Sequence, residues 1–87
     1  MTTTTYTWRP VDGDEVVVTL TKQHKTSYNV ALATTGAVLG RVFLDAVPER
    51  GWRFTRHVFD EVRGSQLRDH IAAVSALLFC LRQEGKV

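Results

Sequence analysis

The stretch 65–85, with the sequence SQLRDHIAAVSALLFCLRQEG, decides which fold the chain can adopt. Its apolar residues recur at intervals of three and four, which is the spacing of an amphipathic helix packed on a core. Ser65 is typical of the residue before a first helical turn, and Gly85 is typical of the position just past a helix end. We therefore predict a C-terminal helix of about 19 residues, which would be about 28 Å long.

The predicted helix has one stripe of large apolar side chains that we expect to face the core. This stripe consists of Leu67, Ile71, Val74, Leu78 and Leu81, with Leu77 at its edge. Other apolar side chains lie well off the stripe, and within 71–81 only Ser75 is polar. A helix that is apolar nearly all round is usually buried on more than one side. The predicted helix therefore needs a second covering surface.

The apolar helix residues left without cover are Ala72, Ala76 and Phe79, with Cys80 beyond them. Exposed apolar patches often mark interaction sites, so the first three form a candidate interface with a second copy of the chain or with another protein. The alternative is that the N-terminal segment covers this patch with its two aromatic residues, Tyr6 and Trp8. The sequence leaves both possibilities open.

The chain ahead of the helix alternates apolar and polar side chains, which is the period of β-strands. Turn residues such as DGD and TTG separate the alternating runs. The expected strands are 15–22, 27–33, 37–45 and 52–59, with a short fifth strand around Tyr6 and Trp8. We expect the threonine-rich segment 1–5 to be a frayed tail and 60–64 to be a turn. Gly40 is expected to mark a bulge or a close approach by a neighbouring side chain.

These elements predict one α+β domain over 1–87, in which an antiparallel sheet of four or five strands packs against one long C-terminal helix. A sheet backed by a C-terminal helix resembles the general plan of integrase arm-binding domains and plant-type AP2 domains. The similarity concerns topology alone, because the chain carries none of the sequence motifs of those families. The predicted fold by itself therefore implies no function.

The composition bounds the location of the protein. The chain has 87 residues, a net charge of +2 and one cysteine, Cys80. One cysteine cannot form an internal disulfide, and a reduced thiol is typical of a cytoplasmic protein. The longest apolar-rich run, 71–81, is far shorter than the ~20 residues that a membrane-spanning helix needs. Because the N-terminus also lacks the pattern of a signal peptide, we expect a cytoplasmic protein with no membrane partner.

The residues that usually carry chemistry are too dispersed for a catalytic or metal site. His24, His57 and His70 lack the close spacing of zinc ligands. The acidic cluster within 12–15 lacks the ligand pattern of a calcium loop. The sequence contains no glycine-rich phosphate motif and no nucleophile motif. We therefore expect a protein that is not an enzyme and has no catalytic residues, bound metal or cofactor.

A cluster of polar and basic side chains lies on two predicted neighbouring strands. Arg53, Thr55 and His57 share one face of a strand, and Arg41 of the preceding strand would lie beside them. A sheet face with these side chains can contact phosphates or a groove of nucleic acid. The alternative is that the arginines pair with nearby carboxylates. Those carboxylates are Asp45, Glu49, Asp60 and Asp69.

We expect a small non-enzymatic binding module, and two functions stay open. The first is a dimeric nucleic-acid-binding accessory protein that uses the sheet face around Arg41 and Arg53. The second is a protein–protein interaction module, such as an inhibitor, adaptor or assembly factor, of the kind that phages and mobile elements carry. In the second function, Phe79 or Trp8 would anchor the partner. The candidate partners are thus a second copy of the chain, a nucleic acid or another protein.

Overall fold

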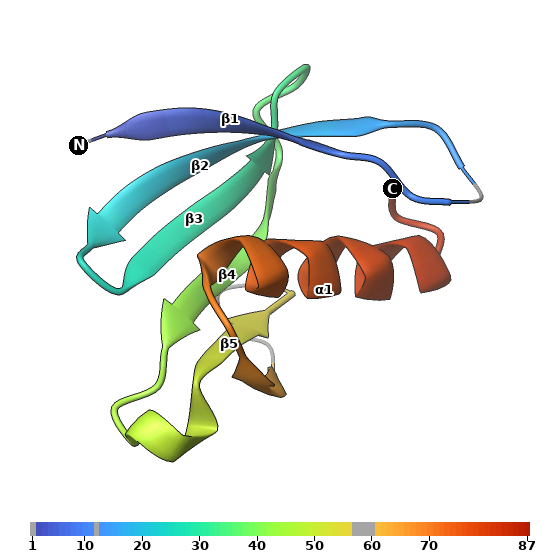
Figure 1. Ribbon diagram of the computed structural model, residues 1–87. Helices are drawn as coiled ribbons and strands as arrows, with labels where there is room; N and C mark the ends of the chain where they lie inside the picture. Colours follow the sequence, from blue (N-terminus) through green and yellow to red (C-terminus); the bar gives the residue numbers. More distant parts are fainter. Residues whose placement is uncertain (1, 12, 57–60) are drawn as a thin grey trace.

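The computed structural model of the protein describes residues 2–11, 13–56 and 61–87. In these residues, six strands form one antiparallel sheet in chain order, and one helix packs on the sheet (Figure 1). The strands are β1 (Thr3–Trp8), β2 (Val16–His24), β3 (Ser27–Leu32), β4 (Val38–Leu44), β5 (Trp52–Thr55) and β6 (Val62–Leu67). The other elements are the 3₁₀ turn η1 (Pro48–Arg50) and the helix α1 (His70–Gln83). The predicted α+β fold is confirmed, but the sheet has six strands rather than four or five.

The hydrophobic core lies between α1 and one face of the sheet. Alternate side chains of a strand point to the same face, and the fully buried ones here are Val18, Leu20, Val30 and Val42. The helix buries Ala73, Val74, Leu77, Leu78 and Leu81 against them. The sheet curls around the helix, so that β1 and β5 lie on opposite sides of α1 (Figure 1). Among the described residues, no helix is both long and apolar enough to cross a membrane.

The helix begins at His70 with Asp69 as its N-cap, so the predicted N-cap at Ser65 is wrong. The carboxylate of Asp69 caps the helix and accepts a hydrogen bond of 2.8 Å from the backbone N–H of Ala72. Upstream of this cap, Gly64 and Gln66 have φ angles of +81° and +57°. A right-handed helix cannot pass through residues in this conformation, because its φ angles are negative.

The residues just before the helix form β6, whereas the sequence predicts a turn over 60–64 and a helix that begins after Ser65. Leu67, expected on the core stripe of the helix, lies opposite Trp52 of β5 and packs against the core from the sheet. Between the pairs Trp52–Leu67 and Phe54–Arg63, β6 has two more residues than β5. The strand is therefore strongly bulged.

The predicted helix end is confirmed. Gly85 has a φ of +75°, and its N–H donates to the carbonyl of Arg82. The N–H of Lys86 donates to the carbonyl of Leu81 at 2.9 Å. This pair of bonds is the Schellman motif, which terminates a helix through a residue with positive φ.

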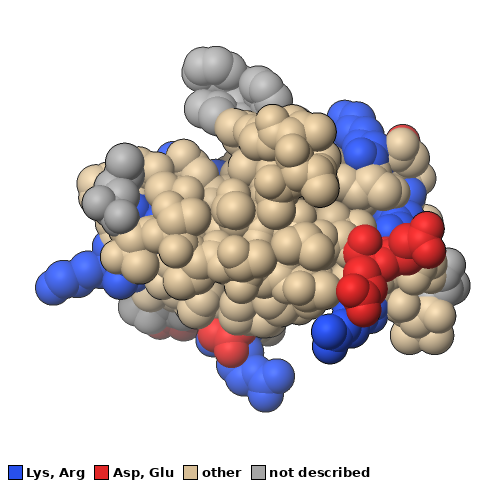
Figure 2. All heavy atoms as spheres, turned by 90° about the horizontal axis from the view of Figure 1, so that it is seen from above, with Lys and Arg blue, Asp and Glu red and all other residues tan. Residues whose placement is uncertain are grey.

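The prediction that 1–5 is a frayed tail is wrong for residues 3–5, which belong to a strand. Thr3, Thr4 and Thr5 belong to β1 and lie opposite residues 19–21 of β2. Threonine is β-branched and favours strands, so the tract extends the strand that Tyr6 was expected to begin. Seen from the β1 side, the surface carries Lys, Arg, Asp and Glu only toward its margins (Figure 2).

Gly40 lies at a bulge, as expected, and the close neighbour is the backbone of Thr55 and Arg56 rather than a side chain. Val30 pairs with Gly40 and Ala31 pairs with Val38, so Leu39 is an extra residue in β4. A Cβ atom on Gly40 would lie 2.1 Å from the carbonyl oxygen of Thr55. Only glycine lets β4 and β5 approach this closely. The predicted strand 52–59 is strand over Trp52–Thr55, and 57–60 lie outside the described residues.

Candidate functional site

The apolar side chains of α1 that lie off the predicted core stripe are partly covered in the structure. Ala76 and Cys80 are partly buried and pack against the core, and Ala72 is half-buried. Phe79 is 59% exposed. An aromatic ring left this far in water is the unusual feature of the helix, because burying it would stabilise the protein. The exposed part of the predicted interface therefore reduces mainly to Phe79.

The N-terminal segment covers the neighbouring part of the helix. The hydroxyl groups of Tyr6 and Ser75 are 3.1 Å apart and form a hydrogen bond. Trp8 is only 9% exposed and belongs to the core. Of the two possibilities that the sequence left open, cover by Tyr6 and Trp8 is thus present, but it stops short of Phe79.

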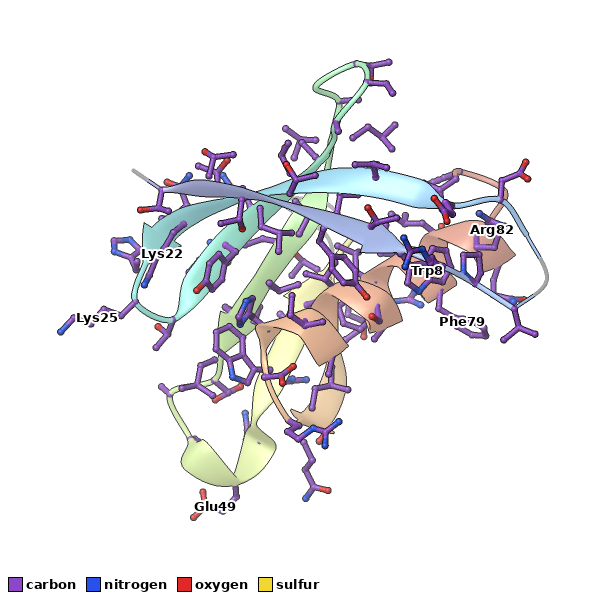
Figure 3. All side chains as sticks on the ribbon, turned by 45° about the horizontal axis from the view of Figure 1, so that its top comes forward. Trp8, Lys22, Lys25, Glu49, Phe79 and Arg82 are labelled. Atoms are coloured by element: carbon purple, nitrogen blue, oxygen red, sulfur yellow. The ribbon has the colours of Figure 1, made fainter. Side chains whose placement is uncertain are left out.

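A groove lies between the end of β1 and the last turns of α1. Its volume is about 470 Å³. Trp8 and Phe79 lie near each other along it, with Arg82 beside them (Figure 3). The described residues that line it are Trp8, Arg9, Pro10, Val11, Phe79, Arg82 and Gln83. The Val11 side chain at its rim is fully exposed, so the groove opens onto an apolar surface.

Arg82 joins the helix to the loop after β1. Its guanidinium carbon lies 5.4 Å from the centre of the Trp8 ring, within the range of a cation–π contact. Its Nη2 donates to the carbonyl oxygen of Asp14 at 3.1 Å. A Cβ atom on Gly13 would lie 1.8 Å from Nη1, so the loop passes closely over the guanidinium. These contacts fix one wall of the groove.

Arg82 and its neighbour Arg9 differ in whether a carboxylate of the described residues pairs with them. The Nε of Arg9 lies 2.9 Å from the carboxylate of Glu15 in an exposed ion pair. Within the described residues, no carboxylate lies at ion-pair distance from Arg82, and its buried Nε has no hydrogen-bond partner. The groove therefore carries the positive charge of Arg82, which no carboxylate of the described residues neutralises.

The residues expected to contact nucleic acid occupy different environments. Arg41 lies opposite Asn29 on one side and Thr55 on the other, so the expected alignment is correct. Thr55, however, is only 2% exposed and cannot contact a ligand at the surface. His57 lies outside the described residues.

Arg53 is half-buried and is held by two partners. Its Nη1 lies 3.2 Å from a carboxylate oxygen of Asp45, and its Nε donates to the carbonyl of Gly64 at 2.9 Å. The backbone N–H of Val47 and the Arg53 guanidinium hold the pKa of Asp45 below its ordinary value. Pairing with a carboxylate, the alternative from the sequence, therefore holds for Arg53 and Asp45.

Arg41 is the member of the expected set that is left for a ligand among the described residues. Its guanidinium carbon lies 5.3 Å from the centre of the Phe43 ring. No carboxylate of the described residues lies at ion-pair distance from it. A shallow hollow of about 250 Å³ adjoins it, lined by Gln23, His24, Ser27, Asn29 and Arg41.

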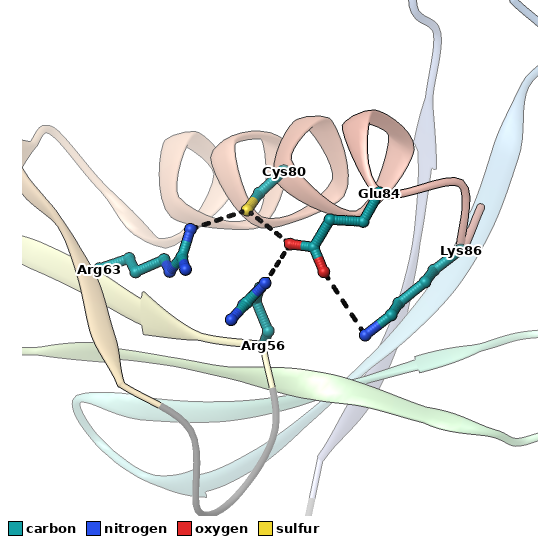
Figure 4. Close-up of polar contacts among 5 residues, drawn as sticks. All are labelled: Arg56, Arg63, Cys80, Glu84 and Lys86. Atoms are coloured by element: carbon teal, nitrogen blue, oxygen red, sulfur yellow. Dashed lines mark hydrogen bonds and ion pairs between the residues drawn. The ribbon is translucent and has the colours of Figure 1, made fainter.

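A polar cluster ties the C-terminal end of α1 to β5 and β6 (Figure 4). Arg56 pairs with Glu84 and lowers the pKa of that carboxyl group. The Cys80 thiol donates to Glu84 at 3.4 Å and accepts from Arg63 at 3.7 Å. Lys86 lies 3.4 Å from the other carboxylate oxygen of Glu84. These contacts join the end of the helix to the sheet, which indicates a structural role for the cluster.

An aromatic cluster at the start of the helix was not expected from the sequence. The rings of Tyr28 and His70 stack at 4.6 Å with an interplanar angle of 15°. Trp52 lies 6.2 Å from Tyr28 and 5.9 Å from His70. Separations of this size are typical of packed aromatic pairs. We interpret the cluster as packing between β3, β5 and α1.

No group of three or more metal-ligating side chains occurs in the described part of the chain. Comparison with protein-family models, with curated protein sequences and with solved structures finds no match. The arguments about function therefore rest on the geometry of this chain alone. The sequence pattern indicates Trp8 and Phe79 but not Arg82, because only the tertiary fold brings Arg82 against Trp8 and the loop at Gly13.

Proposed function

We propose that the protein is a non-enzymatic protein-binding module that holds a segment of another protein in the groove between β1 and α1. The observation that carries this proposal is Phe79, whose ring is 59% exposed beside a groove of about 470 Å³. Binding energy in protein interfaces concentrates on aromatic and arginine side chains that line such pockets. Trp8, Phe79 and Arg82 supply this combination.

The chemistry of the groove indicates the chemistry of the partner. Trp8, Val11 and Phe79 offer an apolar surface for one aliphatic or aromatic side chain. Arg82 offers a positive charge beside it, and a carboxylate of the partner would complement that charge. The expected partner segment therefore places an Asp or Glu next to an apolar anchor. An inhibitor, an adaptor and an assembly factor would all work by such docking.

Selection from a library of random peptides displayed on phage would test this proposal directly. We expect selected peptides to combine an apolar anchor with an acidic neighbour. Phe79→Ser should weaken their binding at least tenfold, because the exposed ring supplies a large part of the contact. Val38→Ser is the matched control, since Val38 is also an exposed apolar residue, at 56%. Peptides that bind wild type and Phe79→Ser equally well would refute the proposal, as would a library that yields no binders.

Binding of nucleic acid is a second candidate, and Arg41 is the observation that favours it. Within the described residues its guanidinium has no carboxylate partner, and it lies beside a hollow lined by polar side chains. Thr55 and Arg53 give no support, because the first is buried and the second is paired with Asp45. This candidate therefore ranks below docking of a protein.

Fluorescence anisotropy with labelled duplex DNA and single-stranded RNA over a range of salt concentrations tests the second candidate. Arg41→Gln should weaken binding and reduce the slope of log affinity against log salt by about 1, because one phosphate contact is lost. Arg68→Gln is the control, since Arg68 is exposed and lies outside the hollow. Absence of binding at low salt would rule out nucleic acid as the ligand of this face.

A further inference from the structure

The open edge of β1 is the surface from which we draw a further inference. The sheet order makes β1 and β6 its two edges. In the described residues, β1 therefore has a hydrogen-bonded neighbour, β2, on one side only. An exposed and regular edge strand can accept another strand. Most natural edges prevent this with charged residues, prolines or bulges, but β1 reads TTTYTW and has none of these.

The direction of the free backbone groups follows from one hydrogen bond. The N–H of Lys22 donates to the carbonyl of Thr2 at 2.8 Å, and these two residues come next in line to the pair Thr3–Thr21, so they lie opposite each other. In an antiparallel pair, hydrogen-bonded and non-hydrogen-bonded residues alternate. Thr3, Thr5 and Thr7 therefore point their N–H and C=O groups away from β2, toward the open edge.

We infer that a second copy of this chain pairs with β1 through this edge. A two-fold axis at Thr5 would place Thr5 opposite Thr5 of the second copy and Thr3 opposite Thr7. These are the residues with outward backbone groups, so each pair can exchange both hydrogen bonds of an antiparallel ladder. The same strand thus offers donors and acceptors at matching positions on both copies, as an interface with two-fold symmetry requires.

The side chains of β1 permit the same register. On one face, threonine would stand opposite threonine, a favourable cross-strand pair. On the other face, Thr4 would stand opposite Tyr6 of the second copy. None of these residues is charged, and the surface around β1 has charged side chains only toward its margins (Figure 2). The two copies therefore meet without repulsion between like charges.

The other edge explains why pairing would stop at two copies. β6 contains Gly64 and Gln66 with positive φ and two residues more than β5 between their paired positions. A strand so irregular cannot offer an unbroken row of donors and acceptors. Pairing of β1 with β6 of another copy would build an open filament, and the irregular edge opposes it. Pairing of β1 with β1 closes after two copies.

Size-exclusion chromatography with light scattering on the full chain tests this inference. Wild type at 100 µM should have twice the chain mass of 9.8 kDa. Thr5→Lys should be a monomer, because it places two like charges opposite each other at the two-fold axis, and Thr5→Glu should be a monomer for the same reason. A mixture of these two variants should recover the double mass, because opposite charges then face each other.

Thr19→Lys is the matched control. Thr19 is opposite Thr5 on β2, one strand in from the edge, so the added charge should leave the dimer intact. Phe79→Ser should also leave it intact, which separates this dimer from binding in the groove. A monomeric wild type would overturn the inference, as would a dimer that survives Thr5→Lys or a species larger than two copies.

Discussion

The two edges of the sheet are built in opposite ways. β1 is regular, uncharged and exposed along its threonines, and two aromatic side chains hold it to the helix and the core. β6 is bulged and has two residues with positive φ, and its backbone lies close to Gly51 of the neighbouring segment. The regular edge at β1 therefore leaves room for a further strand, whereas the bulges and positive φ angles of β6 close the other edge.

Removing the Trp8 ring, which anchors β1 to the core, should cause the largest loss of stability. Trp8→Ala removes a ring that is only 9% exposed and leaves a cavity beside Arg82. We expect a loss of about 3–5 kcal/mol in the free energy of unfolding, as measured by urea titration. Val38→Ala, at an exposed site, should cost less than about 0.5 kcal/mol. A loss below about 1 kcal/mol for Trp8→Ala would mean that the ring does not anchor β1.

Adding a side chain at Gly51, which lies against β6, should cause the next largest loss of stability. Gly51 has a φ of +64°, and its added Cβ would lie 2.9 Å from the Cα of Gln66. Gly51→Ala should therefore cost about 2–4 kcal/mol in urea titration, from backbone strain and the clash together. Gly36→Ala is the control, because Gly36 has a φ of +76° with nothing within 4 Å. Only the strain of about 1 kcal/mol should remain there, and equal losses would contradict the close packing of β6.

Removing the hydrogen bond between Tyr6 and Ser75 should show how much this bond contributes to holding β1 on the helix. Tyr6→Phe removes the 3.1 Å contact with Ser75 and should cost about 1 kcal/mol. Ser75→Ala should cost about the same amount. The double variant should lose little more than either single variant, because the two changes remove one interaction. Strictly additive losses in urea titration would show that the bond contributes nothing.

Lowering the pH should cause the smallest loss of stability, and it should act through Asp45 on the β5 side of the sheet. The hydrogen bond from Val47 and the pairing with Arg53 lower the pKa of Asp45 in the folded state. Its stabilising contribution is therefore present above the pKa of the unfolded chain and is lost as the pH falls through the lower folded value. Asp45→Asn should be less stable than wild type at pH 7, and the gap should close near pH 2. A gap that stays constant with pH would contradict this account.

The exposed ion pair of Arg9 and Glu15 near β1 supplies the control for the acid experiment. Glu15→Gln should change the stability little at either pH, because exposed pairs contribute at most about 1 kcal/mol. The urea midpoints of the two variants would then assign the acid sensitivity to the β5 side of the sheet.

The sequence predicted the fold class well and the element boundaries unevenly. The end of the helix at Gly85 was correct, because one glycine in one conformation determines it. The start was wrong because Ser65 and Asp69 are both good caps, and local preference cannot choose between them. The positive φ of Gly64 and Gln66 decides the choice, and it depends on how β6 packs beside β5.

The site was predicted in part for a similar reason. The position of Arg41 beside Thr55 was foreseen, since both residues were expected on neighbouring strands. The burial of Thr55 was not foreseen, because it follows from the close approach of β4 and β5 at Gly40. Phe79 and Trp8 were predicted as possible anchors of a partner, and the groove that they share depends on a loop that only the tertiary fold positions.

The placement of the two tryptophans has a practical consequence. The chain has two of them, Trp8 in β1 and Trp52 in β5, so each side of the sheet carries its own fluorophore. Trp8 lies against a guanidinium group, and Trp52 lies near the rings of Tyr28 and His70. Trp8→Phe and Trp52→Phe would each leave one reporter. Coincident unfolding transitions from the two would show that both sides melt as one cooperative unit.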